Sequence, residues 1–194
     1  MAAAGMGMHR HSVARDESEL GNRLVESLAL GGATRGTLIE LFIDGREFTV
    51  LVVCQALNAC GLEAYPAVEM CYQPATPAEE RILFHGHRDT SSPHAPVRSH
   101  GQTNPHCVYN IAPPELQERL RDTAARAFTA VGGIGYGRVD MRMDSAGRIY
   151  VLEVNANCSL SREEPTIAHA LAQHGQDIVG LIAMILAEAE SHHA

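Results

Sequence analysis

Hydrophobic and polar positions along the chain follow two periods. Apolar residues at helical spacing predict amphipathic helices, and strict alternation predicts half-buried strands. Helices are expected over residues 16–30, 115–131, 166–174 and 177–190. Strands are expected over residues 37–43, 47–53, 67–72, 82–84, 136–143 and 148–155. Strand pairs flanked by helices favour an α+β fold.

Turn and capping residues mark the ends of these elements. Pro113 and Pro114 precede the longest expected helix, where proline fits the first turn, and Gly132 follows it. Asp44 and Gly45 separate two expected strands and indicate a hairpin. Residues 144–147 separate the last two strands in the same way. We therefore expect two hairpins in the sheet.

Residues 85–107 differ from the rest, because they are rich in His, Ser, Pro, Thr and Gly and show no hydrophobic period. A connection of this length is usually functional or disordered. Its possible zinc ligands are His85, His87, His94, His100, His106 and Cys107. Since no C-x-x-C or H-x₃-H spacing supports a closed tetrahedral site, we favour a solvated or substrate-facing loop.

Composition limits the class of partner and the compartment. The 194-residue chain has a formal net charge of −8 and no apolar run of bilayer length, so neither nucleic acid nor a membrane is expected as a partner. Every basic residue is arginine, which excludes a P-loop or Schiff-base lysine. The cysteines form no C-x-x-C pair, and we expect reduced thiols in an intracellular, cytoplasmic protein. The acid-poor first 15 residues leave organellar targeting as an alternative.

The second expected hairpin, GYGRVDMRMDSAGRIYVLEVN, carries the most informative pattern. By alternation, its apolar face consists of Val139, Met141, Met143, Tyr150, Leu152 and Val154. The opposite face then consists of Arg138, Asp140, Arg142, Glu153 and Asn155. If the turn centres on Ala146 and Gly147, Asp140 lies opposite Glu153. In the same register Arg138 lies opposite Asn155.

Two carboxylates that face each other repel unless something neutralises them. A divalent cation held by Asp140, Glu153 and Asn155 would do so. Oxygen donors without sulfur or imidazole suit Mg²⁺ or Mn²⁺, and Mg²⁺ usually retains water and phosphate oxygens as further ligands. This pattern indicates a nucleotide-phosphate site. The alternative is a solvated sheet face on which Arg138 and Arg142 cancel the two acids.

The pattern R-x-D followed by L-E-x-N-x-N resembles the metal-binding end of ATP-grasp enzymes of the D-alanine–D-alanine ligase type. The resemblance implies an ATP-grasp domain, an antiparallel sheet flanked by helices. It implies that Asp140, Glu153 and Asn155 hold Mg²⁺ on the phosphates of ATP. It also implies a catalytic role for Arg138, which would stabilise charge on the transferring phosphoryl group.

A second segment, LIELFIDGREFTVLVV, resembles the V-E-E-F-I-x-G-R-E-x-T-V segment of the same family. By this resemblance, Glu40, Leu41 and Ile43 line the adenine pocket through side chains and backbone. Glu47 would contact the ribose. The alternative is an edge hairpin whose glutamates face water.

The activity implied by the resemblance is a carboxylate–amine ligase that acts through an acylphosphate. Its partners would be small-molecule carboxylate and amine substrates, amino acids among them, with either a second copy of the chain or an N-terminal lobe as the protein partner. The alternative is an ATP-binding module, or a degenerate pseudoenzyme without ligase turnover. The absence of lysine favours this alternative, and the metal trio with its arginine argues against it.

The resemblance covers residues 16–194 as one ATP-grasp domain, with residues 1–15 as a flexible terminus or a remnant of the glycine-rich flap. The family's N-terminal substrate domain and its first ATP-binding lysine would precede this chain. Because the chain has no lysine, His87 or Arg88 would have to replace the second phosphate-binding lysine. Ser159 stands where the family has a glycine that supplies an oxyanion-hole N–H.

Overall fold

A computed structural model describes residues 12–29, 37–55, 61–78, 81, 107–161 and 164–191. The chain divides into two compact units, Met1–Ile43 with Ala75–Arg98, and Asp44–Pro74 with Ser99–Ala194. The expected flap remnant, the strand at 82–84 and the histidines of the long loop lie outside the described residues.

The first unit contains the helix α1 (Glu17–Ala29) and an irregular segment. Asp16 caps the helix, since its Oδ1 accepts a hydrogen bond from the Glu19 backbone N–H at 2.8 Å. Residues 37–44 form neither helix nor strand, so the predicted first hairpin is wrong. The physical reason lies in the following strand, whose two edges are already occupied by other strands.

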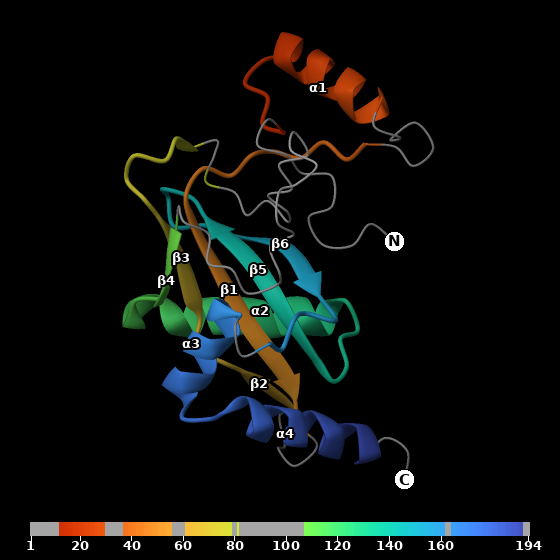
Figure 1. Ribbon diagram of the computed structural model, residues 1–194, viewed down its shortest axis with the longest axis vertical. Helices are drawn as coiled ribbons and strands as arrows, with labels where there is room; N and C mark the ends of the chain where they lie inside the picture. Colours follow the sequence, from red (N-terminus) through yellow and green to blue (C-terminus); the bar gives the residue numbers. More distant parts are fainter. Residues whose placement is uncertain are drawn as a thin grey trace, which may run out of the picture. The chain divides into compact units, whose positions relative to one another are not determined.

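The second unit is an antiparallel sheet with three helices, as Figure 1 shows. Its strands are β1 (Arg46–Cys54), β2 (Leu62–Ala64), β3 (Val68–Tyr72), β4 (Cys107–Ile111), β5 (Tyr136–Met143) and β6 (Ile149–Asn155). Its helices are α2 (Pro114–Ala130), α3 (Pro165–His174) and α4 (Ile178–Ser191). The strand order is β4-β3-β1-β5-β6, and β2 pairs with β1 beside β3. The predicted α+β class is confirmed.

The predicted helices of this unit and the strands β1, β3, β5 and β6 are confirmed within a few residues. The sequence pattern missed β2 and β4. β2 has 3 residues, and β4 follows directly on the long segment that the pattern assigned to a loop. A strand as short as β2 carries too few alternating positions to stand out from its surroundings.

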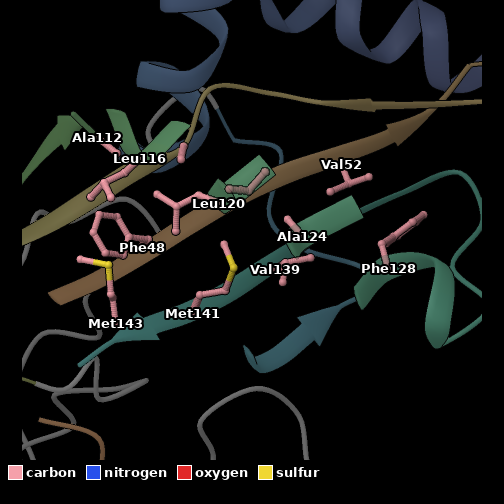
Figure 2. Packing of buried hydrophobic residues seen from close by; sticks show 12 residues of the cluster. Phe48, Val52, Ala112, Leu116, Leu120, Ala124, Phe128, Val139, Met141 and Met143 are labelled. Carbon is pink, nitrogen blue, oxygen red and sulfur yellow. The ribbon is translucent and has the colours of Figure 1, made fainter. Parts of the chain in front are cut away.

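α2 covers one face of the sheet. Its buried residues are Leu116, Leu120, Ala124 and Phe128. They pack against alternate residues of β1 and β5, among them Phe48, Val50, Met141 and Met143. Figure 2 shows the side chains of this cluster between the helix and the two central strands. Burial of alternate apolar residues is the main reason for the strand register on this face.

α3 and α4 cover the other face through a second cluster. Leu51 and Val53 of β1 belong to this cluster, as does Leu181 of α4. Among the described residues, no single helix is long and apolar enough to cross a membrane, although α3 and α4 reach that length and composition as a pair bent by 88°.

Gly45 immediately precedes β1, where its backbone closely approaches the backbone of Met143. This close approach gives a first prediction. A Cβ at this position would overlap the carbonyl oxygen of Met143, the residue that pairs with Arg46. We expect Gly45→Ala to lower the free energy of unfolding by about 1–3 kcal/mol, because the strands must shift apart. Denaturant unfolding measures this loss. Ser145→Ala, at the exposed turn nearby, should stay within about 0.5 kcal/mol of the wild type. Equal stability of the two variants would contradict the close approach.

Candidate functional site

The β5–β6 hairpin brings the predicted metal-site residues together. Asp140 pairs with Glu153 and Arg138 pairs with Asn155, so both predicted pairs are confirmed. The turn, however, is closed by a hydrogen bond from the Asp144 backbone N–H to the Arg148 carbonyl oxygen, 3.0 Å long. The predicted turn centre is therefore off by half a residue.

A β-bulge reconciles this turn with the site register. Near the turn, Met141 pairs with Val151, yet the next pair is Asp140 with Glu153. Leu152 is thus the extra residue of β6, and it moves the pairing by one position. Without the bulge, the carboxylate of Asp140 would lie opposite a leucine.

The bulge also corrects the predicted apolar face. Ile149 and Val154 pack against the core under α2, whereas Tyr150 and Leu152 do not belong to it. Tyr150 donates a hydrogen bond to Asp144 Oδ2 at 3.1 Å, and Leu152 is 48% exposed. The prediction for these two residues is wrong, because strict alternation does not hold across a bulge.

Asp140 is the centre of a network of short hydrogen bonds. Arg138 donates from Nε to Oδ1 at 2.9 Å and from Nη2 to Oδ2 at 2.8 Å. Thr49 Oγ1 donates to Oδ1 at 2.7 Å, and Asn155 Nδ2 donates to Oδ2 at 2.8 Å. The same Asn155 Nδ2 donates to Glu153 Oε1 at 3.0 Å. An arginine and an amide therefore offset the repulsion of the two carboxylates.

The alternative to a metal site was a sheet face on which Arg138 and Arg142 cancel the charges of Asp140 and Glu153. It is confirmed for one arginine only. Arg138 cancels Asp140, as that alternative expected. Arg142 pairs with Glu47 rather than with Glu153, its Nη2 lying 3.2 Å from Glu47 Oε2. Glu153 is exposed and receives its hydrogen bond from Asn155.

Arg138 is a permanent cation in these surroundings. Burial by itself lowers the pKa of Arg138, but the adjacent Asp140 carboxylate outweighs it, so that the pKa of the guanidinium is raised. A fixed positive charge beside oxygen donors is suited to holding a phosphoryl group.

Glu47 lies on the same sheet face as Asp140. Its neighbour two positions along β1, Thr49, contacts Asp140, and residues two apart in a strand share a face. We call this surface, made of Glu47, Thr49, Arg138, Asp140, Arg142, Glu153 and Asn155, the site face. Leu51 continues it toward the core under α3 and α4. The predicted ribose residue and the predicted metal residues are therefore on adjacent strands of one surface.

The Glu47 carboxylate is almost fully buried, with 5% of the residue exposed. Burial raises the pKa of Glu47 to about 7, while Arg142 and the hydroxyl of Tyr72 counteract this rise. Tyr72 donates to Glu47 Oε2 at 3.0 Å. The glutamate is therefore held by two donors on one oxygen.

The three predicted adenine residues lie in the other unit. Glu40, Leu41 and Ile43 belong to its irregular segment, where Leu41 is 83% exposed. Their role in an adenine pocket stays a prediction. His87 and Arg88, the proposed substitutes for lysine, lie outside the described residues.

The donor set of the site face fits a metal bound together with phosphate. Asn155 lies within hydrogen-bonding distance of both Asp140 and Glu153, so that three side chains with oxygen atoms lie side by side. A turn of the Asn155 amide would exchange its nitrogen for its oxygen. In the described part of the chain, no group of three His, Cys, Asp or Glu residues could hold a metal alone. Phosphate and water would have to complete the shell, as Mg²⁺ prefers.

Sequence reasoning missed two residues that shape this site, Thr49 and Tyr72. Thr49 and Tyr72 come from strands far away in the chain, and only the pairing of β1 with β3 and β5 reveals their place. Alternation along β5 already predicts Arg142 on this face beside Arg138 and Asp140. Its partner Glu47 could not be read from that pattern.

Cys158 follows β6 and is buried, which gives a second prediction. Burial raises the pKa of the Cys158 thiol to about 11. At pH 8 its thiolate fraction should be about 100-fold lower than that of an exposed cysteine, since thiolate falls tenfold per pKa unit. We expect iodoacetamide to label Cys158 slowly in the native protein and readily in urea, as read by peptide mass spectrometry. Equal labelling rates in both states would contradict the burial.

Comparisons with known proteins place this geometry in a family context. A family described as "D-ala D-ala ligase C-terminus" matches residues 98–187. The D-alanine--D-alanine ligase of Pseudoalteromonas translucida is 32% identical over 149 residues, which cover 77% of this chain and 41% of the relative. That of Halorhodospira halophila is 31% identical over 185 residues, or 91% of this chain and 53% of the relative. The chain spans about half the length of the curated relatives it matches.

A solved structure shows the same fold. The D-alanine--D-alanine ligase from Bacillus anthracis complexed with ATP superposes with a TM-score of 0.58 at 19% identity. The match covers 91% of this chain and 47% of that chain. At this identity the likeness concerns the fold alone.

Proposed function

We propose that this chain, which is similar to the C-terminal part of D-alanine–D-alanine ligases of the ATP-grasp type, binds Mg²⁺ and ATP at its site face for a carboxylate–amine ligation. The observation that carries the proposal is the convergence of Arg138, Asp140 and the Asn155–Glu153 pair on one sheet face. The relatives named D-alanine--D-alanine ligase make amino acids the first substrates to test.

In the proposed reaction, a substrate carboxylate oxygen attacks the γ-phosphorus of ATP, and the bond to the ADP oxygen breaks. An amine then attacks the acylphosphate carbon, phosphate leaves with the bonding electrons, and the amine nitrogen loses a proton. Both steps depend on positioning and on neutralising phosphate charge.

The side chains divide this work between them. Asp140, Glu153 and Asn155 would hold Mg²⁺, which when bound supplies charge neutralisation at the phosphates. Arg138 would contact the transferring phosphoryl group with its two donor nitrogens. Glu47 would accept a hydrogen bond from a ribose hydroxyl.

A second candidate function is an ATP-binding module without turnover. The observation that favours it is the complete absence of lysine, because arginine differs from lysine in reach and geometry at a phosphate. Phosphate release with candidate amino acids and Mg·ATP separates the two functions. Binding of Mg·ATP without release of phosphate would favour the ATP-binding module.

Thermal unfolding tests the binding of Mg²⁺ and ATP, which both candidate functions require. Mg²⁺ and ATP together should raise the melting temperature, since a ligand at 100 times its Kd stabilises by about 2.7 kcal/mol. At about 2–4 °C per kcal/mol for a chain of this size, the shift is about 5–11 °C. ATP or Mg²⁺ alone should shift it less.

The matched variants locate the binding site. Asp140→Ala/Glu153→Ala should lose the Mg²⁺-dependent shift. Glu118→Ala/Asp122→Ala, which removes two exposed acids of α2, should retain it. A chain that shows no shift at saturating Mg·ATP, or the same shift in the first double variant, would sink the proposed site.

A further inference from the structure

The two carboxylate oxygens of Asp140 have different neighbours. Oδ1 accepts hydrogen bonds from Thr49 Oγ1 at 2.7 Å and from Arg138 Nε at 2.9 Å. Oδ2 accepts hydrogen bonds from Arg138 Nη2 and from Asn155 Nδ2, both at 2.8 Å. Thr49 belongs to β1 and Asn155 to β6, the two strands that flank Asp140 on β5. Oδ1 is therefore held from the β1 side, and Oδ2 from the side where Asn155 also contacts Glu153.

Thr49 has a fixed position in the centre of the sheet. It pairs directly with Asp140 of β5 on one side and with Val68 of β3 on the other. The residue is 3% exposed, so bulk water does not compete for its hydroxyl. A β-branched side chain has few χ1 rotamers, and a carboxylate can only accept the hydroxyl proton. The sheet therefore determines where Asp140 Oδ1 is held.

The donors to Asp140 differ in their part in the proposed function. Arg138 would turn toward the transferring phosphoryl group, and Asn155 would present its amide oxygen to Mg²⁺. Both donors to Oδ2 would then leave this oxygen. Thr49 has no part in holding phosphate or metal, so its bond to Oδ1 can persist while a cation is bound. This bond then decides which oxygen of Asp140 faces the cation.

We propose that Thr49 is a positioning residue that holds Asp140 by Oδ1, so that the carboxylate offers Oδ2 alone to a divalent cation, and that it thereby gives the site a preference for Mg²⁺ over Ca²⁺. The inference rests on the proposed function, which places Mg²⁺ and ATP on the site face. Ca²⁺ takes more oxygen ligands than Mg²⁺ and often binds both oxygens of one carboxylate, whereas Mg²⁺ demands a near-octahedral shell. A carboxylate restricted to one oxygen favours the smaller ion.

The test measures the Kd of Mg·ATP and of Ca·ATP by calorimetry with the full chain. The wild type should bind Mg·ATP more tightly. Thr49→Val, which keeps the shape of the side chain without its hydroxyl, should weaken Mg·ATP binding by about 10-fold or more, the usual effect of losing a hydrogen bond behind a metal ligand. Binding of Ca·ATP should weaken less, because the released Oδ1 can become a second ligand. The ratio of the Ca·ATP Kd to the Mg·ATP Kd should therefore fall by about 3–10-fold.

Two further variants support this comparison. Thr49→Ser retains the hydroxyl and should restore most of the preference for Mg·ATP. Thr166→Val is the matched control, because Thr166 is also buried and its Oγ1 also donates to a carboxylate, that of Glu164, at 3.1 Å. It should leave the ratio of the two Kd values unchanged. Melting temperatures show which variants fold, and Thr49→Ala removes the same hydroxyl if Thr49→Val does not fold.

The outcomes separate this inference from the proposed function. Tight Mg·ATP binding with an unchanged ratio in Thr49→Val would overturn the positioning role alone. An equal loss of affinity for Mg·ATP and Ca·ATP would assign Thr49 to structure only, and would also overturn it. So would a wild type that binds the two complexes equally well. A wild type that binds no Mg·ATP would overturn both proposals.

Discussion

Arg138→Met is expected to abolish phosphoryl transfer while strengthening the binding of a metal ion to the nucleotide-free protein. Arginines that stabilise charge on a transferring phosphoryl group contribute about 10³–10⁵-fold to the rate. In the present state, however, Arg138 occupies both oxygens of Asp140. Under the proposed function, the same guanidinium would serve the reaction and would compete with a cation for its ligand.

The expected gain in metal affinity follows from the hydrogen bond between Arg138 and Asp140, which must be broken before a cation can bind Asp140. A charge-assisted hydrogen bond contributes about 1.5–3 kcal/mol, so its removal should tighten Mn²⁺ binding by about 10-fold or more. Titration of Mn²⁺ followed by electron paramagnetic resonance measures this directly. Phosphate release in the presence of candidate amino acids measures the activity.

Arg148→Met is the control for this experiment, because Arg148 also pairs with an aspartate, Asp144, but on the exposed end of the hairpin. It should change neither Mn²⁺ affinity nor turnover. If Arg138→Met weakened Mn²⁺ binding, Arg138 would support the metal ligands rather than compete with the ion, and this interpretation would be wrong.

Phe128→Ala is expected to cause the largest loss of stability. Phe128 is 1% exposed and fills the end of the core between α2 and the sheet (Figure 2). A Cβ on Gly137 of β5 would lie 2.7 Å from its ring, which shows how closely the ring meets the backbone. Truncation of a buried phenylalanine costs about 3–5 kcal/mol through lost burial and the cavity left behind.

Denaturant and thermal unfolding measure this loss. At about 2–4 °C per kcal/mol, the melting temperature should fall by about 6–20 °C. Val131→Ala is the control, since Val131 follows the same helix but is 64% exposed, and it should change stability by less than about 0.5 kcal/mol. A loss below about 1 kcal/mol for Phe128→Ala would mean that the core around this ring can collapse.

The prediction of the Asp140–Glu153 pair was right although one step of its reasoning was wrong. The turn closes between Asp144 and Arg148, and continued pairing from there would have placed Asp140 opposite Leu152. The bulge at Leu152 restores the predicted pair. A count of residues from the turn cannot contain the extra residue that a bulge adds to one strand.

The helices of the second unit and the strands β1, β3, β5 and β6 could be read from the sequence, because periodicity and turn residues are local. The same holds for the shared face of Arg138, Asp140 and Arg142, which follows from alternation along one strand. Local patterns also suggested a strand at 37–43, which the structure lacks because β1 has no free edge to pair with it.

The sequence by itself determined which side chains the β5–β6 hairpin presents: an arginine, two carboxylates and an amide within one local motif. Only the tertiary structure decided how they are used. Thr49 reaches Asp140 across 91 positions of the chain, and Glu47 meets Arg142 and Tyr72 through pairing with two other strands. Such contacts arise because the central strands pack against α2 on one face and against α3 and α4 on the other. Register between distant strands is set by this packing, and it placed Arg138 beside Asp140 and Arg142 beside Glu47.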